Sequence, residues 1–187
     1  MKRIIGAIFF LMAFNLQAEN FSYNNINISY SSVDLEIIPG FTISGNGLDL
    51  EANIEINKNI FIPLRYQSIG YDFDVDASSY LFGIGGHMPI SSTVDVFGML
   101  QLGNYELDVP PSFDDDVTAL TVGMRTKFSS NEIMLYFTSI SMDENFEDQS
   151  GIGAKLNVPL NKNTAITVRT EFLSDIETIS IGAQFDF

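Results

Sequence analysis

Strict alternation between apolar and polar residues is the feature that most constrains how this chain can fold. Residues 47–56 show it without interruption: every even position from Leu48 to Ile56 is apolar, and the odd positions hold glycine, acids or asparagine. A period of two puts neighbouring side chains on opposite faces of an extended strand, which a helix cannot do. This segment is therefore predicted to be a β-strand with one apolar and one charged face.

The same alternation recurs along the whole chain. It returns in residues 178–187 and in seven further segments, around residues 60–66, 80–88, 94–102, 120–128, 133–137, 152–158 and 166–172. A less regular segment at residues 25–32 carries Ile26, Ile28 and Tyr30. These patterns predict an all-β, antiparallel up-and-down transmembrane barrel of ten strands. Eight strands are the alternative, because the first strand is irregular and residues 37–44 could instead extend the first hairpin.

Connections between these strands alternate in character. Tight links rich in Asn, Ser and Pro follow every second strand, at residues 57–59, 89–93, 129–132 and 160–163. The links after the other strands are mostly longer and acidic. Short turns on one rim and longer loops on the other are typical of outer-membrane barrels, whose short turns face the periplasm.

The N-terminus predicts export. Met1-Lys2-Arg3 precedes an apolar run at residues 4–14, and Ala18 supplies a small residue at the expected cleavage point. That run would span only about 16 Å as a helix, roughly half of a ~30 Å hydrocarbon core. We therefore expect residues 1–18 to be a signal peptide and residues 19–187 to form the barrel. The sequence has no cysteine, so no disulfide can stabilise the exported chain.

The two faces of the predicted strands differ in charge. No charged residue falls on the apolar face of the second to tenth strands, which favours contact with lipid. A soluble periplasmic lipocalin-like binder remains an alternative, because it would turn the same apolar face inward. The opposite face is expected to line the lumen, where a mixed set of charges could pair: Asp49, Glu51, Glu55, Arg65, His87, Asp95, Arg125, Lys127, Lys155, Arg169, Glu171 and Asp186.

Aromatic residues fall near both ends of the predicted strands. Interfacial girdles of aromatic side chains are typical of membrane barrels, although aromatic residues also favour strands in general. The expected upper girdle contains Tyr30, Tyr66, Tyr80 and Phe172, and the lower one contains Phe128, Phe185 and Phe187.

The C-terminal segment, which ends in Phe185-Asp186-Phe187, resembles the signal by which outer-membrane barrels are recognised for assembly. Together with the glycine-rich stretches at residues 83–86 and 151–153, it makes the mature chain resemble the small outer-membrane β-barrel superfamily of OmpX-like and porin-family proteins. This resemblance implies a Gram-negative outer-membrane location. It also implies contact with lipid and lipopolysaccharide, and assembly by the barrel-assembly machinery.

Two pairs in the predicted lumen could carry chemistry. If the turn is centred on Ser91, His87 faces Asp95, which is half of a hydrolase constellation. Enzymes among such barrels work near the outer rim, whereas His87 is expected near the periplasmic mouth, so a structural or pore-lining role is favoured. If the next turn upstream is centred on Lys58, Glu51 faces Arg65. This pair is more consistent with an ion-pair network that fills a narrow barrel than with a charged constriction that filters solutes.

Asp72, Asp74 and Asp76 are spaced like the start of a calcium loop. Ala77 and Gly83 stand where such a loop needs glycine and a bidentate glutamate, so an EF-hand is rejected. The three aspartates remain weak calcium candidates, and no firm metal site or cofactor is expected.

The expected surface loops contain sixteen acids and no lysine or arginine: Asp34, Glu36, Asp72, Asp74, Asp76, Glu106, Asp108, Asp114, Asp115, Asp116, Asp143, Glu144, Glu147, Asp148, Asp175 and Glu177. Most of the net charge of −15 is therefore expected on one rim. Such a rim repels nucleic acid and attracts cations, and divalent ions could bridge it to lipopolysaccharide phosphates.

The sequence thus favours a non-enzymatic integral outer-membrane protein that serves envelope integrity or surface interaction. A narrow, weakly cation-selective channel for small solutes is the second hypothesis. A surface enzyme acting on lipid or peptide is less favoured, because the predicted outer rim has no histidine.

Overall fold

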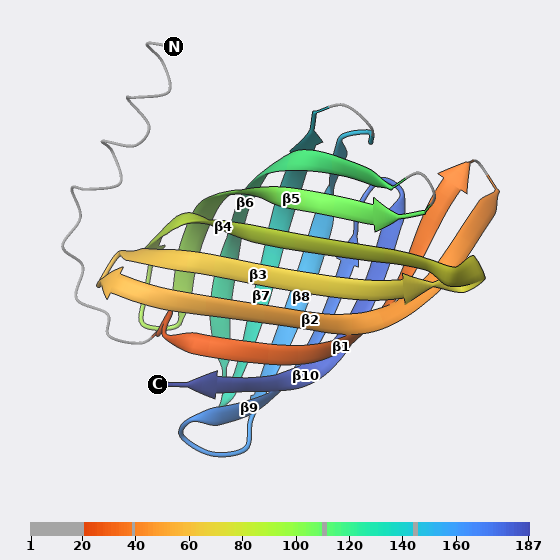
Figure 1. The fold of residues 1–187 in the computed structure, drawn as a ribbon. Coiled ribbons are helices and arrows are strands. Elements are labelled where there is room, and N and C mark those ends of the chain that lie inside the picture. Colours follow the sequence, from red (N-terminus) through yellow and green to blue (C-terminus); the bar gives the residue numbers. More distant parts are fainter. Residues whose placement is uncertain (1–20, 39, 110–111, 144–145) are drawn as a thin grey trace, which may run out of the picture.

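A computed structural model describes residues 21–38, 40–109, 112–143 and 146–187. Its strands form a closed antiparallel barrel in which each strand pairs with its neighbours in the chain and β1 pairs with β10 (Figure 1). The strands are β1 (Asn25–Ile38), β2 (Phe41–Asn57), β3 (Ile60–Tyr71), β4 (Val75–Pro89), β5 (Val94–Asp108), β6 (Phe113–Phe128), β7 (Asn131–Met142), β8 (Gln149–Pro159), β9 (Thr164–Phe172) and β10 (Ile176–Asp186), with a 3-10 helix, η1 (Asp72–Asp74), between β3 and β4.

The predicted ten-strand up-and-down barrel is confirmed, and the eight-strand alternative is wrong. The irregular first segment pairs along its length with β2 and β10, since strand pairing satisfies its backbone groups whatever its side-chain pattern. The expected signal peptide, residues 1–18, lies outside the described residues.

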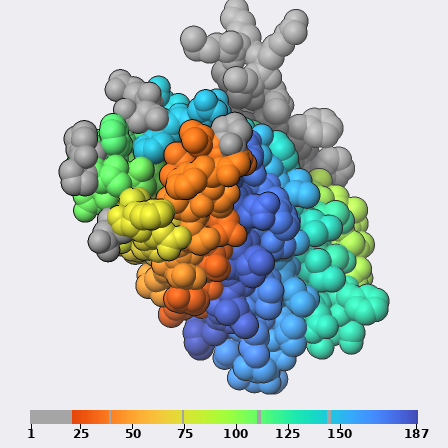
Figure 2. All heavy atoms as spheres, turned by 90° about the vertical axis from the view of Figure 1, so that its right-hand side faces the viewer, coloured from red at the N-terminus to blue at the C-terminus, as the bar shows by residue number. Residues whose placement is uncertain are grey.

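The strands extend further toward one end than the sequence suggested. β1 and β2 pair up to Ile38 and Phe41, and β5 and β6 pair up to Leu107 and Phe113. Much of the acidic sequence expected in long loops therefore lies in strands. The strands continue beyond the apolar band because pairing with a neighbouring strand satisfies backbone hydrogen bonds outside a membrane as well as within it. These extended hairpins lie at the right of Figure 1, opposite the tight turns and the C-terminus, and Figure 2 views this end.

The outer face of the barrel carries a continuous apolar band. On β2 the outward side chains from Leu48 to Ile56 are apolar, a stretch of about 27 Å along the strand and about 20 Å after a ~40° tilt. Outward residues of other strands, such as Ile152 and Ile181, are likewise exposed. All seven aromatic residues of the expected girdles are exposed, which is consistent with their predicted role. In the described part of the chain, no helix is long and apolar enough to cross a membrane.

The inner face carries polar side chains and several large aromatic rings. Two glycines make room for these rings against the wall. A Cβ on Gly85 would lie 2.2 Å from the Phe61 ring, and one on Gly153 would lie 2.3 Å from the Tyr136 ring. Such distances are far below van der Waals contact, so these glycines allow each aromatic ring to lie flat over the neighbouring strand.

Candidate functional site

The lumen is the candidate site, because the predicted charged residues all turn toward it. The structure divides them into two groups. A mid-lumen group contains Asp49, Glu51, Arg65, Lys155, Arg169 and Glu171. A second group, at the tight-turn end that is expected to face the periplasm and is therefore called the periplasmic group, contains Glu55, His87, Asp95, Arg125, Lys127 and Asp186. Their role as lining of a conducting pore stays a prediction.

Asp49 on β2 is the most enclosed member of the mid-lumen group. Its side chain has no exposed surface. Its Oδ2 atom accepts hydrogen bonds from Arg65 Nη2 at 2.8 Å, from Gln67 Nε2 at 3.2 Å and from Arg169. A carboxylate removed from water needs such partners, so Asp49 is tied to both β3 and β9.

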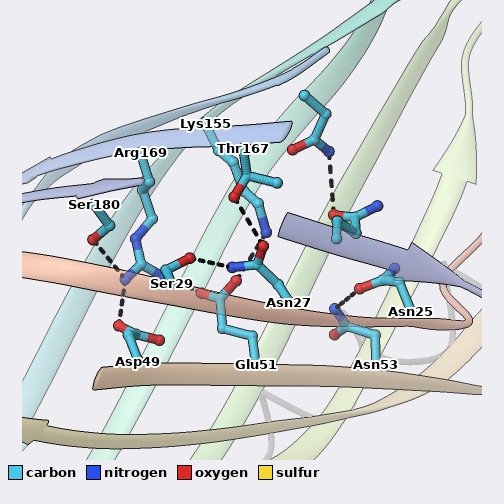
Figure 3. Close-up of polar contacts among 12 residues, drawn as sticks. Asn25, Asn27, Ser29, Asp49, Glu51, Asn53, Lys155, Thr167, Arg169 and Ser180 are labelled. Carbon is cyan, nitrogen blue, oxygen red and sulfur yellow. Dashed lines mark hydrogen bonds and ion pairs between the residues drawn. The ribbon is translucent and has the colours of Figure 1, made fainter. Parts of the chain in front are cut away.

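The neighbouring carboxylates extend this network across the barrel. Glu51 accepts from Lys155 Nζ on β8 at 2.9 Å and from Arg169 on β9 (Figure 3). Glu171 accepts from Arg65 Nη2 at 3.0 Å and from the Tyr136 hydroxyl at 2.8 Å. Three acids and three bases cancel in charge, so the mid-lumen is spanned by a neutral network of ion pairs.

The predicted register of Glu51 and Arg65 is confirmed, since the two residues are direct cross-strand partners. The two side chains nevertheless form their ion pairs with other residues. Arg65 bridges Asp49 and Glu171, while Glu51 binds Lys155 and Arg169. Strand pairing fixes Cα positions, but long side chains in a narrow barrel also reach diagonally and across the lumen.

A seam of small polar side chains on β1 joins this network to its neighbours. Asn27 accepts from Thr167 Oγ1 at 2.9 Å and donates to Ser29 at 2.8 Å. The hydroxyls of Ser31 and Ser180 lie 2.8 Å apart. Figure 3 shows Asn27, Ser29, Thr167 and Ser180 beside Arg169 and Lys155. The polar residues that made the first strand look irregular therefore form its buried inner face.

The segment before β1 lies inside the lumen, between its middle and its periplasmic end. The Tyr23 ring stacks on Phe61 and on His87, with ring centroids 4.2 Å apart in both pairs, and its hydroxyl donates to Asp95 Oδ2 at 3.0 Å. Burial raises the pKa of the Tyr23 phenol, which keeps it protonated as a donor. Tyr23 therefore acts as part of a plug.

Cationic side chains of β6 hold the same segment. The Arg125 guanidinium lies 4.4 Å from the Tyr23 ring centroid and 5.2 Å from that of Phe21, and Lys127 Nζ lies 4.8 Å from the Phe21 ring. Arg125 also donates to the Ser22 carbonyl at 3.2 Å and pairs with Glu132 at 2.8 Å. We call Phe21, Ser22, Tyr23 and Asn24 the N-terminal plug.

The predicted direct pairing of His87 with Asp95 is wrong. The turn is centred on Ser92, one residue later than expected, so His87 is opposite Phe97 and Asp95 is opposite Pro89. The side chains still meet diagonally, with His87 Nδ1 3.0 Å from Asp95 Oδ2. This contact lacks hydrogen-bond alignment, and Tyr23 covers the imidazole. Both features fit the expected structural role, and the absence of enzymatic activity stays a prediction.

The remaining open volume shows how completely these side chains fill the middle of the barrel. A cavity of about 100 Å³ lies between Tyr23, Phe61, Tyr136 and the mid-lumen ion pairs. That volume admits a few water molecules. A wider vestibule of about 710 Å³ lies on the periplasmic side, next to Phe21. The mid-lumen cavity is therefore too small for a sugar-sized solute to pass from the periplasmic vestibule through the middle of the barrel.

Calcium binding by the three weak candidates stays a prediction. Asp72 accepts the Ser44 backbone N–H at 3.3 Å, and Asp76 lies exposed on β4. Among the described residues, no group of three or more His, Cys, Asp or Glu side chains is placed to hold a metal ion.

Sequence reasoning missed the aromatic part of the lumen. Phe21 and Tyr23 lie at odd positions, in step with the inward residues of β1, and this continued alternation was the available signal. Phe61 and Phe97 also face inward, although a lumen was expected to be lined by polar side chains. Phe185 and Phe187 lie exposed at the end of the chain, and their part in assembly stays a prediction.

Comparisons with known proteins bear on the fold. No protein-family model matches the sequence, and no curated protein matches it either. Among solved structures, the translocator domain of autotransporter NalP from Neisseria meningitidis is similar over 98% of this chain and 96% of that chain, with a TM-score of 0.51 at 8% identity.

Two further structures give the same result. The beta domain of the Bordetella autotransporter BrkA is similar over 89% of this chain and 100% of that chain, with a TM-score of 0.51 at 10% identity. The NanC porin is similar over 87% of this chain and 99% of that chain, with a TM-score of 0.50 at 9% identity. At these identities the likeness shows the fold alone. The expected outer-membrane β-barrel fold is confirmed, and its apolar outer face agrees with the expected outer-membrane location.

Proposed function

We propose that this chain is a non-conducting, non-enzymatic outer-membrane protein that presents an acidic surface to the exterior for envelope integrity or surface interaction. One observation carries the proposal: the lumen is closed at two levels, by the mid-lumen ion pairs and by the N-terminal plug. The cavity of about 100 Å³ between them is too small for a solute. A barrel closed in this way can act through its rim and wall more readily than through its interior.

The orientation of the wall supports a membrane protein over the soluble lipocalin-like alternative. A soluble binder would turn its apolar faces inward, toward a ligand. Here Leu100, Val122 and Ile152 face outward, whereas Asp49, Lys155 and Arg169 are buried inside. Exposing this many apolar side chains to water would be unfavourable, at about 25 cal/mol per Å² of apolar surface.

The acidic end supports the proposed surface role. Outward carboxylates on the strand extensions include Asp34, Glu106, Asp116 and Glu177. Our proposal is that divalent cations bridge such groups to lipopolysaccharide phosphates, and that nucleic acid is repelled. Binding of the purified protein to lipopolysaccharide should then require Mg²⁺ or Ca²⁺ and be lost with EDTA; binding that persists in EDTA would remove the bridging ions from the proposal.

Planar-bilayer recording tests the closed lumen against the cation-selective channel. We expect the wild-type protein to insert without resolved single-channel steps at neutral pH. Steps whose size changes in Glu51→Gln or Arg65→Gln, but not in Lys162→Gln in the exposed β8–β9 turn, would establish the channel and overturn the closed barrel.

The proposed absence of enzymatic activity has its own test. Lipid A and a set of peptides are incubated with the folded protein in detergent and analysed by mass spectrometry. We expect both to remain unchanged. Products that disappear when the protein is heat-denatured would show that the barrel is an enzyme.

A further inference from the structure

A second cavity, which we call the outer vestibule, lies at the end of the barrel formed by the extended hairpins. It encloses about 1030 Å³, roughly ten times the volume left in the mid-lumen. Ligand pockets for small molecules typically measure about 300–1,000 Å³. The outer vestibule is therefore large enough for a drug-sized molecule, and the ion pairs beneath it close the way through.

The wall of the outer vestibule is mainly apolar. Ile43, Val75, Leu107, Met142 and Ile176 line it. Tyr105 and Phe146 also line it, with their rings in an edge-to-face arrangement and their centroids 5.0 Å apart. An apolar wall with aromatic rings stabilises the apolar body of a ligand and can also attract a cation through the ring faces.

The charged groups of the outer vestibule all have the same sign. Glu36, Glu147 and Asp175 line it, and no lysine or arginine is among its lining residues in the described part of the chain. Asp175 is held in place: its Oδ2 accepts from Gln149 Nε2 at 2.9 Å, and its backbone N–H donates to Gln149 Oε1 at 3.0 Å. Gln149 is itself buried, so this carboxylate is fixed at the edge of an apolar cavity.

From this combination we propose that the outer vestibule binds amphipathic organic cations from the exterior, with the apolar body against Ile43 and Val75 and the cationic group near Glu36, Glu147 and Asp175. The apolar wall selects against small hydrated metal ions, which would lose their water there without replacement ligands. The carboxylates select against organic anions. The binding is proposed to be independent of conduction, since it uses only the outer half of the lumen.

Equilibrium dialysis of tetraphenylphosphonium against the protein in lipid nanodiscs tests the proposal, with empty nanodiscs measuring uptake by the lipid. We expect saturable binding to the wild type. In the triple variant Glu36→Gln/Glu147→Gln/Asp175→Asn, we expect at least a fivefold higher Kd.

A matched control distinguishes binding inside the outer vestibule from general electrostatic attraction by the acidic end of the barrel. Asp76→Asn/Glu106→Gln/Asp116→Asn removes the same charge from outward positions at the same end of the barrel, and we expect less than a twofold change in Kd. Equal weakening in both triple variants would overturn the proposed site.

A third variant tests the apolar wall without altering charge. Val75→Trp fills part of the outer vestibule, and we expect it to abolish saturable binding while the barrel remains folded by its heat-dependent gel mobility. Tetraphenylborate, which has the same shape and the opposite charge, should show no saturable binding. Unchanged binding to Val75→Trp, or saturable binding of both ions, would exclude a cation site in this cavity.

Discussion

The middle and the outer end of the lumen are built from the same alternating strands but have opposite contents. In the middle, ion pairs, stacked rings and the N-terminal plug leave about 100 Å³ between them. At the outer end, apolar side chains such as Ile43, Val75 and Leu107 line a space of about 1030 Å³.

This difference shows that strand alternation decides which side chains point inward but not whether they fill the space. Long charged side chains reach one another across the barrel, and Phe61 and Tyr136 add volume where glycines allow them to lie flat. Short aliphatic side chains of the outer half cannot reach the opposite wall. The stability of the barrel should therefore respond strongly to mutations in the filled middle of the lumen and weakly to mutations at its hollow outer end.

Arg169→Met should have the largest effect. It leaves buried Asp49 and Glu51 with fewer cationic partners, and breaking such a buried pair destabilises a protein by about 3–5 kcal/mol. Guanidinium unfolding in lipid vesicles, followed by circular dichroism, measures the loss. Asp49→Asn/Arg169→Met restores neutrality and should recover part of the stability. A double variant as unstable as the single one would mean that Arg169 stabilises the barrel by packing and not by its charge.

Val122→Arg tests the outer wall against the filled interior. Val122 faces outward on β6 near the middle of the apolar band, where an arginine costs about 2–4 kcal/mol in a membrane barrel. Thr118→Arg, four residues nearer the acidic end on the same face, should cost about 1 kcal/mol or less. The same unfolding measurement checks both, and equal effects would contradict the assigned position of the membrane.

Tyr23→Phe should have a smaller effect, of about 1 kcal/mol. The substitution keeps the stacking on Phe61 and His87 and removes only the hydrogen bond to Asp95. Tyr23→Ala also removes the ring and should destabilise the barrel further. If the two variants are equally stable, the N-terminal plug is not packed in the lumen.

Leu107→Ala should have the smallest effect. Leu107 is half-buried and already borders the outer vestibule, so truncation enlarges an existing space instead of creating a new cavity. We expect less than about 1 kcal/mol of destabilisation by the same measurement. A loss comparable to that of Arg169→Met would show that the outer half is as tightly filled as the rest.

The sequence was enough to predict the strands and their inward and outward faces. It was also enough to predict that Glu51 and Arg65 are cross-strand neighbours. Period-two alternation fixes the face of a side chain, and a tight turn fixes the register, so both are local properties. Where the turn was longer, as between His87 and Asp95, an error of one residue in its centre shifted the predicted pairs. The signal peptide, the assembly signal and the binding of lipopolysaccharide remain predictions.

By itself, the sequence determined a barrel with an apolar exterior and a mixed set of inward charges. Only the tertiary structure decided which charges meet, because Arg169 and Asp49 are 120 residues apart and come together through barrel closure. It also decided that Phe21 and Tyr23 enter the lumen and that the outer half stays hollow. Alternation is encoded within a strand, whereas filling depends on the side chains that closure brings to face one another across the lumen.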